Sequence, residues 1–259
     1  MAGHSKWAQI KRQKSVADAR RGQLFTKLAR EITVAVREGG PDPETNFRLR
    51  LAIARAREHN MPLENIERAI RRAAGGGTEA GEAPLEEVIY EGYGPGGIAI
   101  LVQALTDNRN RTAAEVRSTF TKGGGSLGEA GSVIWQFDYK GVITVAADGA
   151  SPDDIALAAI DAGAEDFRVE DVEVEVYTQP EDLERVRREL EARGFKVVQA
   201  ELAYIPKATI PLDRKDAEQA LRLLERLEDL DDVQRVYTNA EFPPDLVAAI
   251  EAEERSHAR

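Results

Sequence analysis

Apolar residues in the first third of the chain recur at helical spacing, three or four residues apart. The pattern predicts a helix over about residues 16–38, ended by Gly39, Gly40 and Pro41. A second helix opens at Asp42, and a third begins at Pro62, because proline is tolerated in the first turn of a helix. The apolar stripes consist of Phe25, Leu28, Ile32 and Ala35, then Phe47, Leu51 and Ala54, then Leu63, Ile66, Ile70 and Ala73.

Strand-like and helical segments alternate in the rest of the chain. "EEVIYEGY" and "IAILVQALT" are rich in branched and aromatic residues and predict strands, and a helix is expected over residues 107–121. After a glycine-rich loop, "SVIWQFDYKGVITVAA" is predicted to form two strands broken at Tyr139, Lys140 and Gly141. Helices are then expected over residues 153–162 and 180–193. The strands around them are "DFRVEDVEVEVYTQ", with a turn at Glu170 and Asp171, and "KVVQAELAYI".

This order predicts an α+β multidomain protein. Residues 141–205 follow the order β-α-β-β-α-β, which is typical of ferredoxin-like domains. Residues 207–239 add a β-α-β piece that has too few strands to bury its own helix, so we expect it to complete the earlier strands. The result is an N-terminal three-helix domain plus two ferredoxin-like-type α/β domains, one inserted in the other. The expected segments are a basic arm and helical domain (1–78), a discontinuous α/β domain (79–135 with 206–243), an inserted α/β domain (136–205) and a C-terminal helical tail (244–259).

Charge is distributed unevenly along the chain. The net charge is -11, yet residues 1–77 contain 16 Lys and Arg against 8 Asp and Glu, whereas the remaining residues contain 19 against 38. Such an asymmetry suggests a polyanion as the partner of the basic part. No apolar run approaches the roughly 20 residues that cross a bilayer, and the first residues are polar and basic. We therefore expect a cytoplasmic protein without a membrane partner.

The residue types that carry most enzyme chemistry are sparse. There is no cysteine, and the three histidines, His4, His59 and His257, stand beside no nucleophile or second metal ligand in the sequence. "GYGPGG" at residues 92–97 matches G-x-G-x-x-G, but a strand-like run follows it where a dinucleotide site needs a helix. The sequence therefore predicts no enzyme, no metal and no cofactor.

A second, weaker group of candidate residues surrounds the predicted helix at residues 107–121. "KGGGSLGEAGS" lacks the ending of a P-loop, but successive glycine amides can form an anion nest, and a plain helix-to-strand connection is the alternative. Two arginines near the start of the helix oppose its dipole, so each has either a phosphate or an internal acid as partner. The candidate secondary contacts are Arg109, Arg111, Lys122, Gly123, Gly124 and Gly125.

The main candidate site is the basic segment at the N-terminus. Residues 3–30 contain eight Lys or Arg and one acid, Asp18, so pairing within the helix cannot neutralise the charge. An aromatic side chain among cations suits stacking on a base or packing into a groove; a solvated helix face is the alternative. The predicted nucleic-acid-binding residues are Lys6, Trp7, Lys11, Arg12, Lys14, Arg20, Arg21, Lys27 and Arg30.

Several long stretches carry a family resemblance. "MAGHSKWAQIKRQKSVADARRGQLFTKLAREI", "NMPLENIERAI", "YEGYGPGG", "LTDNRNRTAAEVR" and "LEDLDDVQRVYTN" closely resemble the YebC/PmpR family, which includes mitochondrial translational activators of cytochrome c oxidase subunit I. The resemblance spans nearly the whole chain. It implies an N-terminal helical domain and two α/β domains, one inserted in the other.

The resemblance also implies a function. Bacterial members are described as probable transcriptional regulators that bind DNA, so we expect a non-enzymatic nucleic-acid-binding regulator. The alternative is a translation factor that binds ribosomal RNA and eases stalls such as those at consecutive prolines, with the ribosome as partner. A small-molecule-sensing module is a third hypothesis, which rests on fold analogy alone.

Overall fold

The N-terminal part folds as three helices around their own core. The computed structural model describes residues 18–75, 84–170 and 173–249, with side chains from Arg21 onward. The helices are α2 (Asp18–Gly39), α3 (Phe47–Glu58) and α4 (Leu63–Ala74). The predicted stripes of the first and third helices contribute Leu28, Ile32 and Ile66 to this core, all almost completely buried, although Leu63 is exposed. The stripe predicted for the second helix is wrong, because α3 buries Leu49, Ala52, Ile53 and Ala56 while Ala54 is exposed.

The side chain of Asn46 fixes the entry of the chain into α3. Its Oδ1 accepts a hydrogen bond from the backbone nitrogen of Leu49 at 3.0 Å, which caps the helix. Its Nδ2 donates to the carbonyl oxygens of Ala35 and Gly40, both at 2.7 Å. One buried side chain thus joins the end of α2 to the start of α3.

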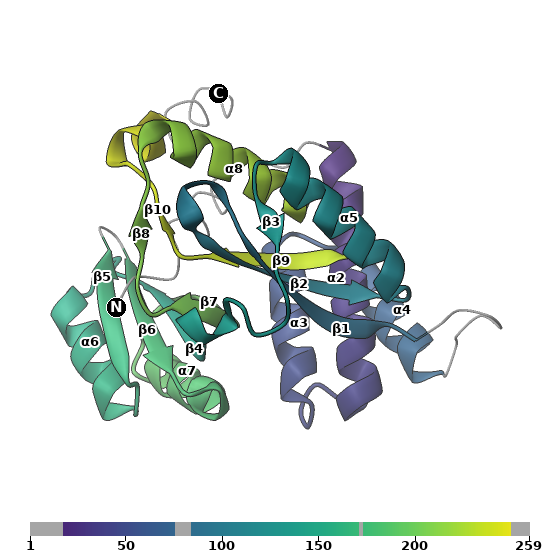
Figure 1. Ribbon diagram of the computed structural model, residues 1–259. Coiled ribbons are helices and arrows are strands. Elements are labelled where there is room, and N and C mark those ends of the chain that lie inside the picture. The colour runs from purple at the N-terminus through teal and green to yellow at the C-terminus, as the bar shows by residue number, and fades with distance from the viewer. Residues whose placement is uncertain (1–17, 76–83, 171–172, 250–259) are drawn as a thin grey trace. The chain divides into compact units, whose positions relative to one another are not determined.

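A four-stranded antiparallel sheet follows, built from two separate parts of the chain. Its spatial order is β3-β1-β2-β9, and α5 and α8 pack together on one face, as Figure 1 shows. This is the ferredoxin-like order with one strand moved to the start of the chain. The elements are β1 (Glu86–Tyr93), η1 (Pro95–Gly97), β2 (Ala99–Thr106), α5 (Arg109–Lys122), β3 (Ser126–Leu127), η2 (Ile134–Gln136), β8 (Ile210–Pro211), α8 (Arg214–Glu228), β9 (Val233–Thr238) and β10 (Ala240–Glu241).

The second sheet lies within residues 137–208 and has the predicted ferredoxin-like order. Its strands are arranged β5-β6-β4-β7, all antiparallel. The elements are β4 (Phe137–Ala146), α6 (Pro152–Asp161), β5 (Asp166–Glu170), β6 (Glu173–Thr178), η3 (Pro180–Asp182), α7 (Leu183–Ala192) and β7 (Val197–Pro206). The predicted fold class, helices plus two α/β domains of ferredoxin-like type, is confirmed.

The predicted strand break at Tyr139, Lys140 and Gly141 is wrong. β4 runs through these residues without interruption and pairs with β7 along its length. The glycine is there for a close approach, because a Cβ on Gly141 would stand 2.3 Å from the Thr178 hydroxyl and 2.9 Å from Cβ of Leu183. In the sequence, a glycine at this place suggests a turn. In the structure, it leaves space for side chains that pack against the strand.

Contacts divide the described chain into two compact units, residues 137–208 and the rest, so the three helices and the discontinuous sheet belong to one unit. Residues 244–249 are helical, and the remainder of the predicted tail lies outside the described residues. The finer domain boundaries stay predictions.

Candidate nucleic-acid interface

Much of the predicted basic segment lies outside the described residues. This holds for Lys6, Trp7, Lys11, Arg12 and Lys14. Arg20 belongs to α2, but its side chain is likewise not described, and Arg21 is exposed in the first turns of the same helix. The prediction that these residues contact nucleic acid therefore rests on the sequence alone.

Lys27 and Arg30 do not point freely into solvent as the sequence suggested. The Lys27 ammonium donates to the backbone oxygen of Glu228 at 2.5 Å. The Arg30 guanidinium donates to the backbone oxygen of Asp231 at 3.0 Å and to Oδ1 of Asp232 at 2.9 Å. Lys27 thus binds the last residue of α8 and Arg30 binds the following turn, residues 229–232, so both cations fasten α2 to this part of the sheet domain.

Asp232 is the centre of this attachment. Its side chain is 3% exposed and accepts hydrogen bonds from Arg30, from Arg111 at 2.8 Å and from the hydroxyls of Thr106 and Thr112 at 3.2 and 2.6 Å. Burial opposes its ionisation, but the hydrogen bonds from Arg111 and Thr112 and the charges of both arginines outweigh burial and lower the pKa of Asp232. The carboxylate is therefore ionised at neutral pH.

The candidate secondary contacts are also largely engaged. Arg111 binds Asp107 as well as Asp232, and Arg109 lies 3.7 Å from a carboxylate oxygen of Glu86. The two arginines that oppose the α5 dipole thus have internal acids as partners, which was one of the two alternatives.

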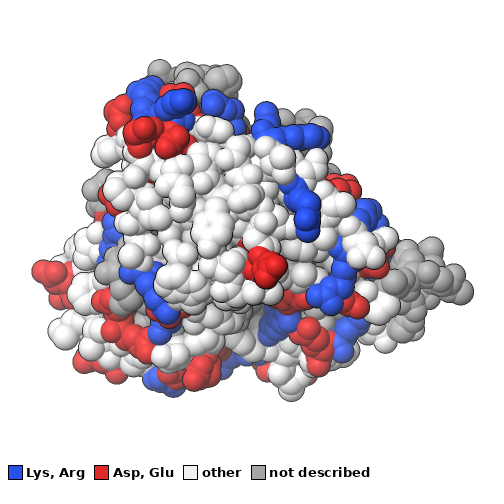
Figure 2. Space-filling view, in the orientation of Figure 1, with Lys and Arg blue, Asp and Glu red and all other residues white. Residues whose placement is uncertain are grey.

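The glycines after α5 do not form an anion nest. The amides of Gly123, Gly124 and Gly125 all donate to carbonyl oxygens of the last turns of α5. The glycines allow close packing instead, because a Cβ on Gly123 would meet Leu223 at 2.6 Å and one on Gly125 would meet the Tyr93 oxygen at 2.4 Å. Lys122 is exposed at the end of α5, and Figure 2 shows basic side chains over this helix.

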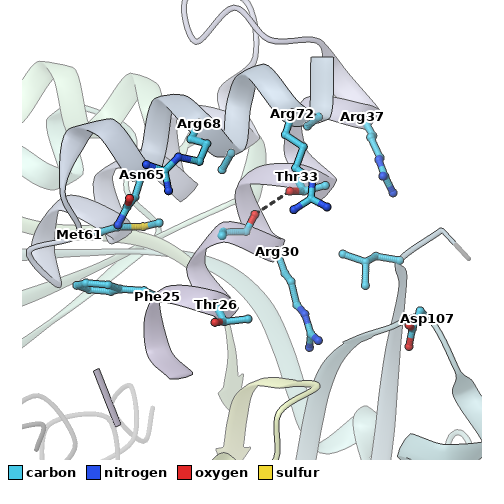
Figure 3. Close-up of a pocket in the computed structure, with 14 residues that line it drawn as sticks. Phe25, Thr26, Arg30, Thr33, Arg37, Met61, Asn65, Arg68, Arg72 and Asp107 are labelled. Atoms are coloured by element: carbon cyan, nitrogen blue, oxygen red, sulfur yellow. Dashed lines mark hydrogen bonds between the residues drawn. The ribbon is translucent and has the colours of Figure 1, made fainter. Parts of the chain in front are cut away.

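A concentration of cations around a hollow surface lies between α2 and α4. A groove of about 560 Å³ runs between the two helices. Arginines at Arg30, Arg37, Arg68 and Arg72 line it, with Asp107 as its one carboxylate, as Figure 3 shows. The other lining residues are Phe25, Thr26, Ala29, Thr33, Met61, Asn65, Ala69, Ala73 and Leu85. The arginines of the groove suit an anionic group, and its apolar side chains suit an apolar part of the same ligand.

The arginines of this groove differ in how far they are already paired. Arg68 forms an exposed ion pair with Glu64 at 2.9 Å, which contributes little to stability, and Arg30 is held by Asp232. Arg37, at the end of α2, makes no hydrogen bond or ion pair with the described residues. An exposed guanidinium without an internal acid is available for a phosphate.

Sequence reasoning missed the groove although the signal was present. Arg68 and Arg72 are four residues apart in α4, and Arg30, Thr33 and Arg37 lie at spacings of three and four in α2, so each set shares one face of its helix. What the sequence could not show is that these two faces lie against each other.

Other kinds of site receive no support within the described part of the chain. It contains no group of three or more His, Asp or Glu side chains that could hold a metal ion. Of the helices in the same residues, none is long and apolar enough to span a membrane.

Comparison with protein families decides the family. A model described as the TACO1/YebC protein N-terminal domain matches residues 5–76, and one described as the TACO1/YebC second and third domain matches residues 85–240. The chain belongs to the TACO1/YebC family. The resemblance seen in the sequence motifs is thus confirmed, and the groove lies in the family's N-terminal domain together with Leu85 and Asp107.

TACO1/YebC relatives match this chain over almost its whole length. A probable transcriptional regulatory protein of Thermomicrobium roseum is 61% identical over 250 residues, covering 96% of this chain and 100% of the relative. A protein of the same description from Roseiflexus castenholzii is 58% identical, covering 95% and 97%. The crystal structure of a conserved hypothetical protein of Aquifex aeolicus is similar with a TM-score of 0.82 at 49% identity, covering 92% and 98%.

Proposed function

We propose that this protein is a non-enzymatic transcriptional regulator that binds DNA through its N-terminal helical domain. The names of its relatives support a regulatory role. The observation that carries the proposal is the groove between α2 and α4, which four arginines and one carboxylate line, Arg30 and Arg68 being paired with Asp232 and Glu64. In a chain with a net charge of -11, such a concentration of cations is unusual and suits a phosphate backbone.

The basic residues before α2 extend the same positive surface in this proposal. Lys6, Lys11, Arg12 and Lys14 would add phosphate contacts, and Trp7 would stack or anchor. Phosphate contacts give affinity and register without reading sequence. Each of them releases counterions, so log K falls against log salt by about 0.9 for every phosphate neutralised.

The test is duplex DNA binding at stepped salt. We expect the variant Arg37→Gln/Arg72→Gln to bind more weakly and to reduce the salt slope by about 2, since two contacts are lost. Arg71 is the matched control, because it is a neighbouring arginine on α4 that does not line the groove. Equal slopes for the wild type, the groove variant and Arg71→Gln would remove the groove from the proposal.

One observation favours a second candidate, a translation factor on ribosomal RNA. α2 packs against the helical core on one side and against the end of α8 and the α8–β9 turn on another, through Gln23, Lys27 and Arg30. A helix held in this way is not free to lie in a major groove, as direct readout of duplex DNA requires. RNA is more often bound through its shape and its unpaired segments.

A gradient experiment separates the two candidates. Wild-type protein that co-migrates with ribosomes, and loses them when Lys6, Lys11, Arg12 and Lys14 are changed to Glu, would favour translation. Tight binding to a promoter duplex that ribosomes do not compete away would favour transcription. The cytoplasmic location predicted from the sequence is consistent with both candidates.

A further inference from the structure

The groove between α2 and α4 has two chemically different ends. Figure 3 shows Phe25, Met61 and Asn65 toward one end, with Arg68 beside them, and Arg37 and Arg72 toward the other. Arg68 is already paired with Glu64. The floor between them is formed by small side chains, Ala29, Ala69 and Ala73, which let the two helices approach while keeping the surface open. One end is suited to an apolar ring and the other to an anion.

The polar group at the apolar end is unused. The side-chain amide of Asn65 makes no hydrogen bond with the described residues, although its backbone nitrogen donates to the carbonyl of Pro62. An asparagine amide offers one acceptor and two donors in a plane, which matches the edge of a nucleobase. Phe25 is only partly buried and lines the same end, so its ring can be covered by a ligand.

The length of the groove fits more than a single anion. Phe25 and Arg37 are twelve residues apart on α2, which corresponds to about 18 Å along the helix axis. A lone phosphate would occupy only the arginine end. A base at Phe25 with its backbone continuing toward Arg37 would use both ends.

We propose that this groove binds unpaired nucleotides of a nucleic-acid strand, and this deepens the proposed function, on which it rests. The base stacks on Phe25 with its edge on Asn65, and the backbone phosphates lie against Arg37 and Arg72. A base inside a duplex cannot reach the groove, because both its faces are stacked and its pairing edge is occupied. The site therefore selects single-stranded segments, whether RNA or DNA.

The experiment compares fluorescent oligoadenylate, oligodeoxyadenylate and a duplex of the same length. We expect the wild type to bind the single strands about tenfold or more tightly than the duplex, since stacking on aromatic side chains adds to the phosphate term. Phe25→Leu keeps an apolar side chain for the helical core, and it should weaken single-strand binding about five- to tenfold while leaving duplex binding unchanged. Asn65→Leu should reduce the preference for a base in the same way.

Leu63→Ala is the matched control, because Leu63 is an exposed apolar residue at the start of α4 outside the groove. The RNA and DNA arms show which strand is preferred, and either preference agrees with the proposal. Equal binding of single strand and duplex, with no effect of Phe25→Leu, overturns this inference and leaves the proposed function standing. Competition by free AMP as strong as by the oligonucleotide also overturns it, since the site would then be a mononucleotide pocket. Failure to bind any nucleic acid would instead overturn the proposed function.

Discussion

Changing Asp232 to Asn tests how the helical domain is held on the sheet. The carboxylate uses Oδ1 for Arg30 and Oδ2 for Arg111, Thr106 and Thr112. An asparagine has the same shape but only one oxygen, so its amide nitrogen must face donors on one of the two sides. The variant therefore loses hydrogen bonds without creating a cavity.

The cost can be bounded from burial and exposure. Removing one partner of a fully buried ion pair costs about 3–5 kcal/mol. Here the acid is buried, but the side chains of Arg30 and Arg111 remain 29% and 44% exposed and can return to water. We therefore expect Asp232→Asn to lower the free energy of unfolding by about 2–3 kcal/mol at neutral pH.

The stability difference between wild type and Asp232→Asn should depend on pH in a predictable direction. The pKa of Asp232 is lower in the folded protein than in the unfolded chain, so the folded state binds the proton less tightly. Its stabilising contribution is complete above the unfolded pKa of about 3.9 and is lost as the pH falls through the folded value. The difference in stability between wild type and Asp232→Asn should thus shrink below about pH 4.

Urea unfolding followed by circular dichroism at several pH values measures this difference. Asp231→Asn is the control, because Asp231 is exposed and its Oδ1 accepts from Gln23, which asparagine can also do. Equal losses in Asp231→Asn and Asp232→Asn would refute the reasoning. A loss in Asp232→Asn that stays constant down to pH 3 would also refute it.

Three other changes have predictable effects on stability. Asn46→Ala should lower the melting temperature by removing about 2 kcal/mol, because one cap and two further hydrogen bonds are lost; Thr45→Ala is the comparison. Glu91→Ala should cost about 2–4 kcal/mol and speed proteolysis after residue 130, because three loop amides at 2.6 to 2.8 Å lose their buried acceptor. Gly22→Ala should instead raise the stability of α2 by about 0.5–1 kcal/mol, since no atom lies within 4 Å of the new methyl group. Thermal melting should therefore show a higher melting temperature for this variant, in contrast to the other two.

Most helices and strands could be predicted from the sequence, because the spacing of apolar residues and the turn residues between segments determine them locally. The stripes predicted for the first and third helices hold most of the residues that α2 and α4 contribute to their shared core, whereas α3 buries Leu49, Ala52, Ile53 and Ala56 in place of the predicted Phe47, Leu51 and Ala54. The β-α-β-β-α-β order was also readable, since turn residues separate the segments. The break expected at Gly141 failed because the reason for that glycine, its contact with Thr178 and Leu183, is made by residues distant in sequence.

The candidate site was predicted less well, also for a physical reason. A run of cations reveals an excess of charge, but not which cations the folded chain neutralises. The acceptors of Lys27 and Arg30 lie about two hundred positions later in the chain, at the end of α8 and in the α8–β9 turn, and no local rule connects them. Conversely, nothing in the sequence connects Arg37 with Arg72. They line the same groove only because α2 and α4 pack against each other.

Photo-crosslinking of a bound oligonucleotide tests the central claim, that nucleic acid lies on the helical domain, most directly. With a photoreactive base in a single strand, digestion and mass spectrometry identify the crosslinked peptides. The account predicts crosslinks within residues 21–37 and 61–74, which disappear in the Arg37→Gln/Arg72→Gln variant and persist in Arg71→Gln. Crosslinks confined to residues 137–208, unaffected by the groove variant, would contradict it.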